Sequence, residues 1–539
     1  MADDLTVIGE PEAVLACSRA LEEKVQDPIH GLRLQHDKAQ SYWFHDQALP
    51  DAFNAFIAQR HIPMFNDSAI LLGAAIGRTA TEAQRREMDA RIQSRTQKHD
   101  QLFNLLTHQS MSAQISTRIL SASMIPRMNY LARTVDPSSL QNAAARFDQK
   151  VATTLQTTLQ LPDLNDGSAA LQQISLPVRH GGLGLRRATQ SLAAAYIGAH
   201  AQAAPHLQRA FPRGLPAGHP MRTAINRALA KIRLAMGPRL AQHWLPPRGA
   251  DTIAYFCSAA GSALAPHFQR SVTALSESRS FQSMLNSASA ETKARFLSCA
   301  GPLAGVWLTA PLNNPKTQMD NTEFACAVRL RIGFPPEENV TGTCSCPRRQ
   351  PVQLEDAPWH GLCCLLQKRK SINRRHNDVV QILAETVRRV YGFAHIEPSR
   401  LDRTRIRPDL ALQMRARRIY ADVAIVHPSA LSHRRVAQRQ LGAANRAERR
   451  KHRRYDNLAR NRRGVFLPFV VETHGAFGGE ARTLMRQITS FAGQERPSQS
   501  KHATLIRLMS EVAVAVQKGN AHAALKCIQD AEGMHVGVA

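Results

Sequence analysis

The sequence lacks two features that would direct a chain to a membrane or to secretion. No apolar run is long enough to span a bilayer. The start, Met1-Ala2-Asp3-Asp4, is acidic, whereas the first residues of a signal peptide are basic. Outside one cluster the cysteines stand singly, which suits a reducing compartment. These single cysteines are Cys17, Cys257, Cys299, Cys326 and Cys527. We therefore expect no membrane partner.

Acidic residues are scarce relative to basic ones. The chain has 69 Lys and Arg against 42 Asp and Glu, a formal net charge of +27. Nineteen Lys or Arg and five Asp or Glu fall between Arg400 and Arg463, so more than half of the excess lies in this stretch. A balance of this kind favours a polyanionic partner. The alternative is an ordinary solvated charged face.

Lysine is nearly missing from the same region. Lys451 is the only lysine between Lys370 and Lys501. It lies in a predicted basic helix, where it is either a phosphate contact or a group that acts in a reaction. Arginines at helical spacing in that helix would follow a DNA backbone and position it without reading its sequence. They are Arg449, Arg450, Arg453 and Arg454.

The length of 539 residues allows three or four domains of ordinary size. Apolar residues recur at three- and four-residue spacing in much of the region 80–330, which predicts a mainly helical middle. The predicted helices there are Gln84–Leu106, Ala113–Leu131 and Ser139–Thr157. Prolines between Pro205 and Pro247 predict loops.

One segment has the spacing of a metal site. Cys344 and Cys346 are followed by His360 and by the adjacent pair Cys363 and Cys364. Three thiolates and an imidazole are the ligands of a tetrahedral zinc site. Both members of the pair fit the fourth position, and Cys364 is favoured because His-x-x-x-Cys brings both side chains to one face of a helical turn. Buried free thiols are the alternative.

Two acids lie in strand-forming surroundings farther on. Asp409 follows Arg407-Pro408, and twelve residues separate it from Asp422 in the apolar run 421–426. Two neighbouring strands that each carry one carboxylate can hold one Mg²⁺ or Mn²⁺ ion, which activates water against a phosphodiester. Taken alone, the pair also fits a turn and the end of a strand.

The elements around the acids form a recognisable order. A helix is predicted to begin near Arg374-Arg375-His376-Asn377, two strands follow, and then come a basic helix over Ala443–Arg460 and a strand over Val465–Glu472. With the zinc spacing and the Pro-Asp…Asp spacing, this order resembles the restriction-like endonuclease domain of site-specific non-LTR retrotransposon proteins.

The other end of the chain has a matching resemblance. Ala2-Asp3-Asp4 is similar to the paired-aspartate box of a reverse-transcriptase palm, and Gly31-Leu32-Arg33-Leu34 is similar to the next palm motif. Residues 71–77 resemble the segment that leads into the thumb. Leu176-Pro177-Val178-Arg179-His180-Gly181-Gly182 and its continuation resemble the linker that follows the thumb.

The resemblance implies a multidomain α+β protein. Its expected parts are the end of a palm (1–80), a helical thumb-like region (81–165), a mostly helical linker (166–335), a zinc knuckle (336–372), a restriction-like PD-(D/E)XK-type nuclease domain (373–500) and a C-terminal helical tail (501–539). It also implies a nuclear site of action, otherwise a cytoplasmic one, with target DNA as partner and element RNA as a further candidate. Asp3 and Asp4 would be metal-binding remnants of the palm. Because the chain starts at this pair, polymerisation is expected to be inactive.

Within the nuclease domain, the resemblance implies that Asp409 and Asp422 bind Mg²⁺ or Mn²⁺. A lysine two residues beyond the second acid helps to polarise water in many such folds, but Ala424 stands there, so Lys451 is the candidate replacement. Glu472 and Glu397 are weaker candidates for a supporting carboxylate. Arg374, Arg375 and His376 are expected to contact nucleic acid. The alternative function is a catalytically decayed, zinc-containing nucleic-acid-binding protein.

Overall fold

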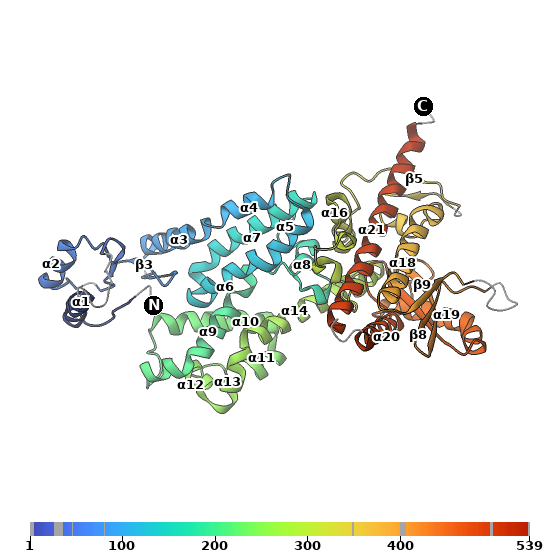
Figure 1. Ribbon diagram of the computed structural model, residues 1–539. Helices are drawn as coiled ribbons and strands as arrows, with labels where there is room; N and C mark the ends of the chain where they lie inside the picture. Colours follow the sequence, from blue (N-terminus) through green and yellow to red (C-terminus); the bar gives the residue numbers. More distant parts are fainter. Residues whose placement is uncertain are drawn as a thin grey trace.

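The structure is a computed structural model that describes residues 5–25, 36–45, 47–79, 81–347, 350–398, 406–495 and 500–536. Asp3 and Asp4, which were expected to be metal-binding remnants of a palm, lie outside the described residues. The molecule is elongated, with a small N-terminal unit at one end, a helical middle, and a C-terminal unit of mixed helix and sheet at the other end (Figure 1). Mixed helix and sheet agrees with the expected α+β class.

The N-terminal unit is small and has a small core. Leu15 of the first helix packs against Phe56 and Ile57 of the second. A tight hairpin follows, and its turn is formed by Leu72 and Gly73, both at positive φ. The elements are α1 (Pro11–Val25), β1 (Ser41–Tyr42), α2 (Asp51–Gln59), β2 (Met64–Phe65), β3 (Ser68–Leu71) and β4 (Ala74–Gly77).

The region 81–165 is helical, as predicted. Its central helix buries one face from Leu140 to Leu159 against its neighbours. The helix predicted over Ala113–Leu131 is interrupted by a π-helical segment over Leu120–Met124, just before Pro126, which lacks a backbone N–H. The elements are α3 (Glu82–Gln97), α4 (Asp100–Leu106), α5 (Ala113–Ile119), α6 (Ile125–Thr134) and α7 (Pro137–Leu159).

The region 166–335 is also mostly helical, and a buried arginine explains its glycine-rich motif. The Arg331 guanidinium is buried and donates hydrogen bonds to the backbone oxygens of Val178, Gly182, Cys299 and Ala304. A side chain at Gly182 would collide with backbone atoms 2.0 Å away, so the motif must close tightly. The helices are α8 (Ala169–Ser175), α9 (Ala188–Ala210), α10 (Pro220–Met236), α11 (Pro238–Trp244), α12 (Thr252–Cys257), α13 (Ala259–Leu264), α14 (Phe268–Ser287), α15 (Ala290–Cys299) and α16 (Asn321–Ile332).

The C-terminal unit is built on a four-stranded sheet of order β10-β9-β8-β7. β9 and β10 are parallel, and the remaining pairs are antiparallel. The predicted strand Val465–Glu472 forms as β10, and the edge strand β7 was not predicted. The elements are β5 (Thr343–Cys344), β6 (Val352–Gln353), α17 (Leu365–Gln367), α18 (Asn373–Arg389), β7 (Phe393–Ile396), β8 (Leu410–Met414), β9 (Arg417–Val426), α19 (Gly442–Asn461), β10 (Val465–Glu472) and α20 (Gly479–Glu495).

The two faces of the sheet are covered differently. α18 packs on one face across β7, β8 and β9, and α19 packs on the other face over β9 and β10. The alternation of strand side chains produces this division: Ile419, Ala421 and Val423 lie in the main core with α18, whereas Tyr420 packs with Tyr455 of α19.

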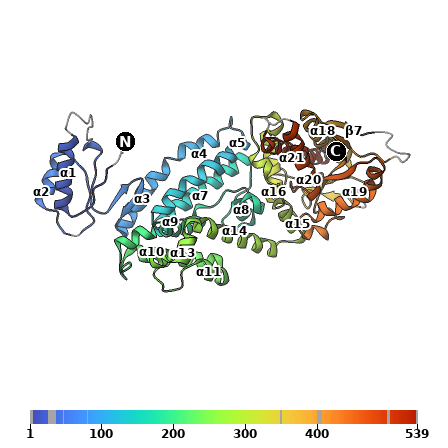
Figure 2. The same ribbon diagram turned by 60° about the horizontal axis from the view of Figure 1, so that its bottom comes forward.

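The last helix, α21 (Lys501–Val536), is a core element where a tail was expected. It lies beside α16, α18 and α20 (Figures 1 and 2) and carries the fully buried residues Leu508, Val512, Val514 and Val516. A helix that is apolar on most of its sides is stable in water only when other elements pack around it. None of the helices among the described residues combines the length and apolar character that crossing a membrane requires.

Candidate metal centres

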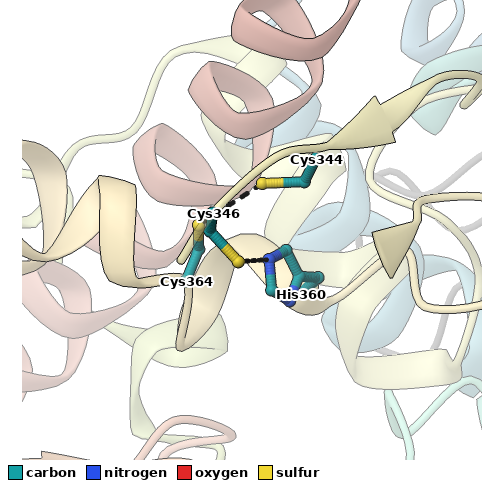
Figure 3. A group of neighbouring side chains, drawn as sticks. All are labelled: Cys344, Cys346, His360 and Cys364. Atoms are coloured by element: carbon teal, nitrogen blue, oxygen red, sulfur yellow. Dashed lines mark hydrogen bonds between the residues drawn. The ribbon is translucent and has the colours of Figure 1, made fainter. Parts of the chain in front are cut away.

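The four predicted zinc ligands come together in the structure. Cys344, Cys346, His360 and Cys364 are all buried, and their ligand atoms lie within 4.8 Å of one another (Figure 3). The Cys344 and Cys364 Sγ atoms are 3.6 Å apart, and Cys346 Sγ is 3.4 Å from His360 Nε2. A tetrahedral zinc with Zn–S bonds of about 2.3 Å would place its sulfur ligands about 3.8 Å apart. The cluster therefore fits zinc in donor type and in size.

The structure places Cys364, and not Cys363, in this cluster. Its thiol accepts a hydrogen bond from Cys527 of α21, which is the main cause of a lowered pKa at Cys364, and a hydrogen bond with His360 acts in the same direction. A thiol that ionises easily suits a zinc ligand. Cys527 looks like an isolated cysteine in the sequence, 163 residues after Cys364, and no local pattern connects the two.

The adjacent cysteines give a matched test of the cluster. We expect Cys364→Ser protein to retain less than about half an equivalent of zinc, because an oxygen replaces one of the soft ligands, and Cys363→Ser protein to retain about one equivalent. Elemental analysis after purification without chelator measures both. Since metal-binding free energy is also folding free energy, removal of zinc should open residues 340–372 to hydrogen exchange. Equal zinc content in the two variants would contradict this assignment.

The two predicted metal-binding acids meet across neighbouring strands. The antiparallel register pairs Leu410 with Ala421, so Asp409 lies opposite Asp422 one position further. Asp409 Oδ2 accepts hydrogen bonds from the backbone N–H of Val423 at 2.6 Å and from His376 Nε2 at 3.0 Å. The Asp422 side chain is only 5% exposed. The twelve residues between the two acids thus form β8, a tight turn and the first part of β9.

Lys451 reaches this pair from α19. Its ammonium group is hydrogen-bonded to Asp422 and lies 3.5 Å from the carbonyl oxygen of Val423. Burial lowers the pKa of Lys451, and the charge of Asp409 acts in the opposite direction. Tyr455, one helical turn later, donates a hydrogen bond to the Arg407 carbonyl at 3.1 Å and fixes the helix against the Pro-Asp segment.

His376 belongs to the same group of side chains. Burial lowers its pKa, but the hydrogen bond and the charge of Asp409 outweigh burial, so the pKa of His376 is raised. Its position on the first turns of α18 brings the predicted Arg-Arg-His-Asn segment to the acids. The structure therefore unites Asp409, Asp422, Lys451 and His376 from three separate parts of the sequence.

Two of the predicted site residues have other roles. Arg375 is 1% exposed and is hydrogen-bonded to Asn520 of α21, so it cannot contact nucleic acid in this structure. Its side chain packs on Gly519, where a Cβ would lie 2.4 Å from the Arg375 side chain. It is a core arginine that joins α18 to α21.

Glu472 is not part of the acid pair either. It lies four residues beyond Pro468, the β10 partner of Asp422, and is 2% exposed. Its carboxylate accepts a hydrogen bond from the backbone N–H of Ala444 at 3.1 Å, in the first turn of α19. Burial raises the pKa of Glu472. An acid at this position satisfies the free N–H groups of a helix start, which is a structural role.

The predicted DNA-contacting arginines lie on the open side of α19. Its buried residues, among them Ala447 and Leu458, face the sheet. The exposed arginines are Arg449, Arg450, Arg453 and Arg454, together with Arg446 and Arg460, which the sequence analysis did not single out; Arg374 on α18 is exposed as well. A row of guanidinium groups therefore runs along the helix that supplies Lys451.

Comparison with known proteins indicates where the chain comes from. A stretch of 454 residues, 83% of the chain, is 21% identical to the retrotransposable element SLACS 132 kDa protein of Trypanosoma brucei gambiense. The chain is similar to a retrotransposon protein. It covers 31% of the length of that relative, and no family model matches it. The similarity supports a retrotransposon-derived protein, in agreement with the resemblance seen in the sequence.

Proposed function

We propose that the C-terminal unit is a divalent-metal-dependent DNA endonuclease of non-LTR retrotransposon descent. The observation that carries the proposal is the meeting of Asp409, Asp422 and Lys451 on one face of the sheet, beneath a helix whose outer side is lined with arginine. The two acids come from neighbouring strands, and Lys451 comes from a helix that begins after the second strand. That three charged residues from separate elements meet at one point supports a shared chemical task.

The acid pair suits a hard cation. Asp409 uses Oδ2 for its hydrogen bonds to Val423 and His376, which leaves Oδ1 as a ligand oxygen. Lys451 neutralises Asp422 in the structure, so a metal ion there would have to displace its ammonium group from the carboxylate. Carboxylate oxygens are the ligands that Mg²⁺ and Mn²⁺ prefer. A bound ion would supply Lewis-acid stabilisation of the phosphate and activation of water.

The residues of the chain itself have distinct tasks in this proposal. The N–H of Val423 and the ring of His376 orient Asp409, and Asp422 is held by Lys451. With Asp422 holding a metal ion, the ammonium group of Lys451 would be available to a phosphate oxygen or to the attacking water. The arginines of α19 hold the DNA backbone along the helix.

The test of the function is a plasmid-nicking assay. Supercoiled plasmid should be converted to the open circle with Mg²⁺ or Mn²⁺ and not without added divalent ion. Zinc content is measured in the same samples, so that loss of the zinc knuckle is not mistaken for loss of the acid site. Absence of nicking with both ions in zinc-replete protein would contradict the proposal.

The arginine row makes a separate prediction about binding. Replacing Arg449 and Arg453 together with alanine should weaken binding to a short fluorescent duplex whatever its sequence, and reduce the slope of log K against log salt by about 2. The matched control is the double Arg→Lys variant, which keeps both charges and should keep the slope. Fluorescence anisotropy over a series of salt concentrations measures it. An unchanged slope in the alanine variant would remove these arginines from the interface.

A second candidate function is nucleic-acid binding without catalysis. Two observations favour it: Asp409 and Asp422 already have cationic or hydrogen-bonding partners in His376 and Lys451, and Ala424 stands where many such nucleases have lysine. This candidate would be favoured if the protein bound DNA with the steep salt dependence of phosphate contacts but did not nick it with added metal ion.

A further inference from the structure

Part of the sheet face that carries Asp422 is open in the described structure. α19 packs mainly over β9 and β10, and Ala411 of β8 packs at the margin of the same cluster, whereas Phe393 and His395 of β7 are exposed. Phe393 of β7 is 78% exposed, although most phenylalanines are among the buried residues. A single exposed ring is common at protein surfaces, so its place in the sheet decides whether it has a role.

The register assigns this ring to the same face as the acids. Partners in an antiparallel ladder project to the same side, and residues two apart along a strand do too. One row across β7, β8 and β9 is Phe393, Gln413 and Arg418, and the next is His395, Ala411 and Tyr420. Tyr420 packs under α19, which fixes the side. The third row holds Asp409 and Asp422, and the Glu397 N–H, just past the end of β7, donates a hydrogen bond to the Asp409 carbonyl at 2.8 Å.

The rows have the chemistry of a single-strand binding surface. Phe393 offers an aromatic face, and His395 is exposed one row closer to the acids, beside Ala411, which packs at the margin of the cluster under α19. Arg418 is exposed in the row of Phe393, hydrogen-bonded to Gln413 and to the carbonyl of Arg462. Aromatic faces with flanking arginines bind unpaired bases and their phosphates.

The geometry points to an unpaired DNA strand that lies along β7 and enters the acid site. Four positions along the strand direction separate Phe393 from the row of the acids, which is about 14 Å. A paired duplex would hide the base faces that Phe393 could stack on. We therefore propose that the site takes DNA with unpaired bases next to the scissile phosphate, with Phe393 as the stacking residue. The claim that this strand is the one to be cut rests on the proposed endonuclease function. The claim that Phe393 binds an unpaired strand does not.

The experiment measures binding of the full chain to fluorescent oligonucleotides without added divalent metal. Phe393→Ala should weaken binding to single-stranded DNA by between about 5-fold and 100-fold and leave duplex binding within 2-fold. Phe393→Trp should bind single strands as tightly as the unchanged protein, and Phe393→Leu should not restore binding. Leu431→Ala, a truncation of another highly exposed apolar side chain in the same unit, is the matched control and should have no effect.

Several outcomes would overturn the proposal. These are single-strand binding that survives Phe393→Ala, equal losses on single strands and duplex, and full rescue by leucine. A loss confined to RNA of the same sequence would reject DNA as the ligand. Because Phe393 is exposed, its replacement should not disturb folding, and the thermal unfolding midpoint of each variant checks this. The endonuclease proposal fails by a different result. In that case nicking is absent, or replacing Asp409 and Asp422 does not change it, while Phe393→Ala and Phe393→Trp still differ in single-strand binding.

Discussion

Replacing Asp422 or Asp409 with asparagine is expected to reduce metal-dependent nicking by about 10³-fold or more. Each variant removes one charged oxygen ligand and keeps the shape of the side chain. Because the two acids act on one ion, the double variant should lose little more than either single one. The rate of plasmid nicking at saturating Mg²⁺ measures this, with Mn²⁺ as a second condition.

The controls for the acid pair separate chemistry from folding and binding. Asp378→Asn, an exposed acid on α18, should nick at the normal rate. Duplex binding by the acid variants should remain or rise slightly, since a negative charge beside the phosphate is lost. The Asp422 variant leaves Lys451 without its buried partner, so its unfolding midpoint must be compared with that of the Asp409 variant. Nicking that persists in the double variant would remove the basis for the enzyme.

Replacing Lys451 with methionine should produce the second large effect. Methionine retains most of the buried length of the side chain and removes the charge that contacts Asp422. If the ammonium group acts on the reacting phosphate or water, nicking should fall by about 10²-fold to 10⁴-fold with duplex binding changed less than 2-fold. The neighbouring Arg450→Met is the control: as an exposed phosphate contact, it should weaken binding slightly and change the nicking rate no more than binding. Equal, modest losses of binding and nicking in both variants would make Lys451 an ordinary phosphate contact.

The parts that sequence reasoning predicted well are those with a local signal. β10 occupies the predicted Val465–Glu472, and α19 begins and ends within one residue of the predicted Ala443–Arg460. The cluster of Cys344, Cys346, His360 and Cys364 follows from ligand spacing, because a metal site needs its ligands at short, regular separations. The strand that carries Asp422 follows from its apolar run.

The parts that were missed depend on contacts between distant residues. Arg375 reads as a surface arginine in a basic motif, but Asn520 and Gly519, about 145 residues later, enclose it. Glu472 reads as a spare carboxylate at a strand end, and only the packing of β10 under α19 assigns it to a helix start. β7 is four residues long and lies at an edge, so its pairing partner decides whether it forms. Lys451 was singled out by its rarity, and its contact with Asp422 depends on the crossing of α19 over the sheet.

The burial of α21 among α16, α18, α20 and the zinc cluster has a consequence for how such proteins diversify. Arg375, Cys364 and Thr473 each have a hydrogen-bonding partner on this one helix. A recombination event that exchanged only residues 373–500 between related chains would combine a foreign α18 and sheet with the original α21. The guanidinium of Arg375 would then meet an amide and a glycine on α21 only if the original helix also carried them at these positions. We expect inherited breakpoints to fall before α16 rather than before α18, so that the knuckle, the sheet and the last helix are transmitted as one block.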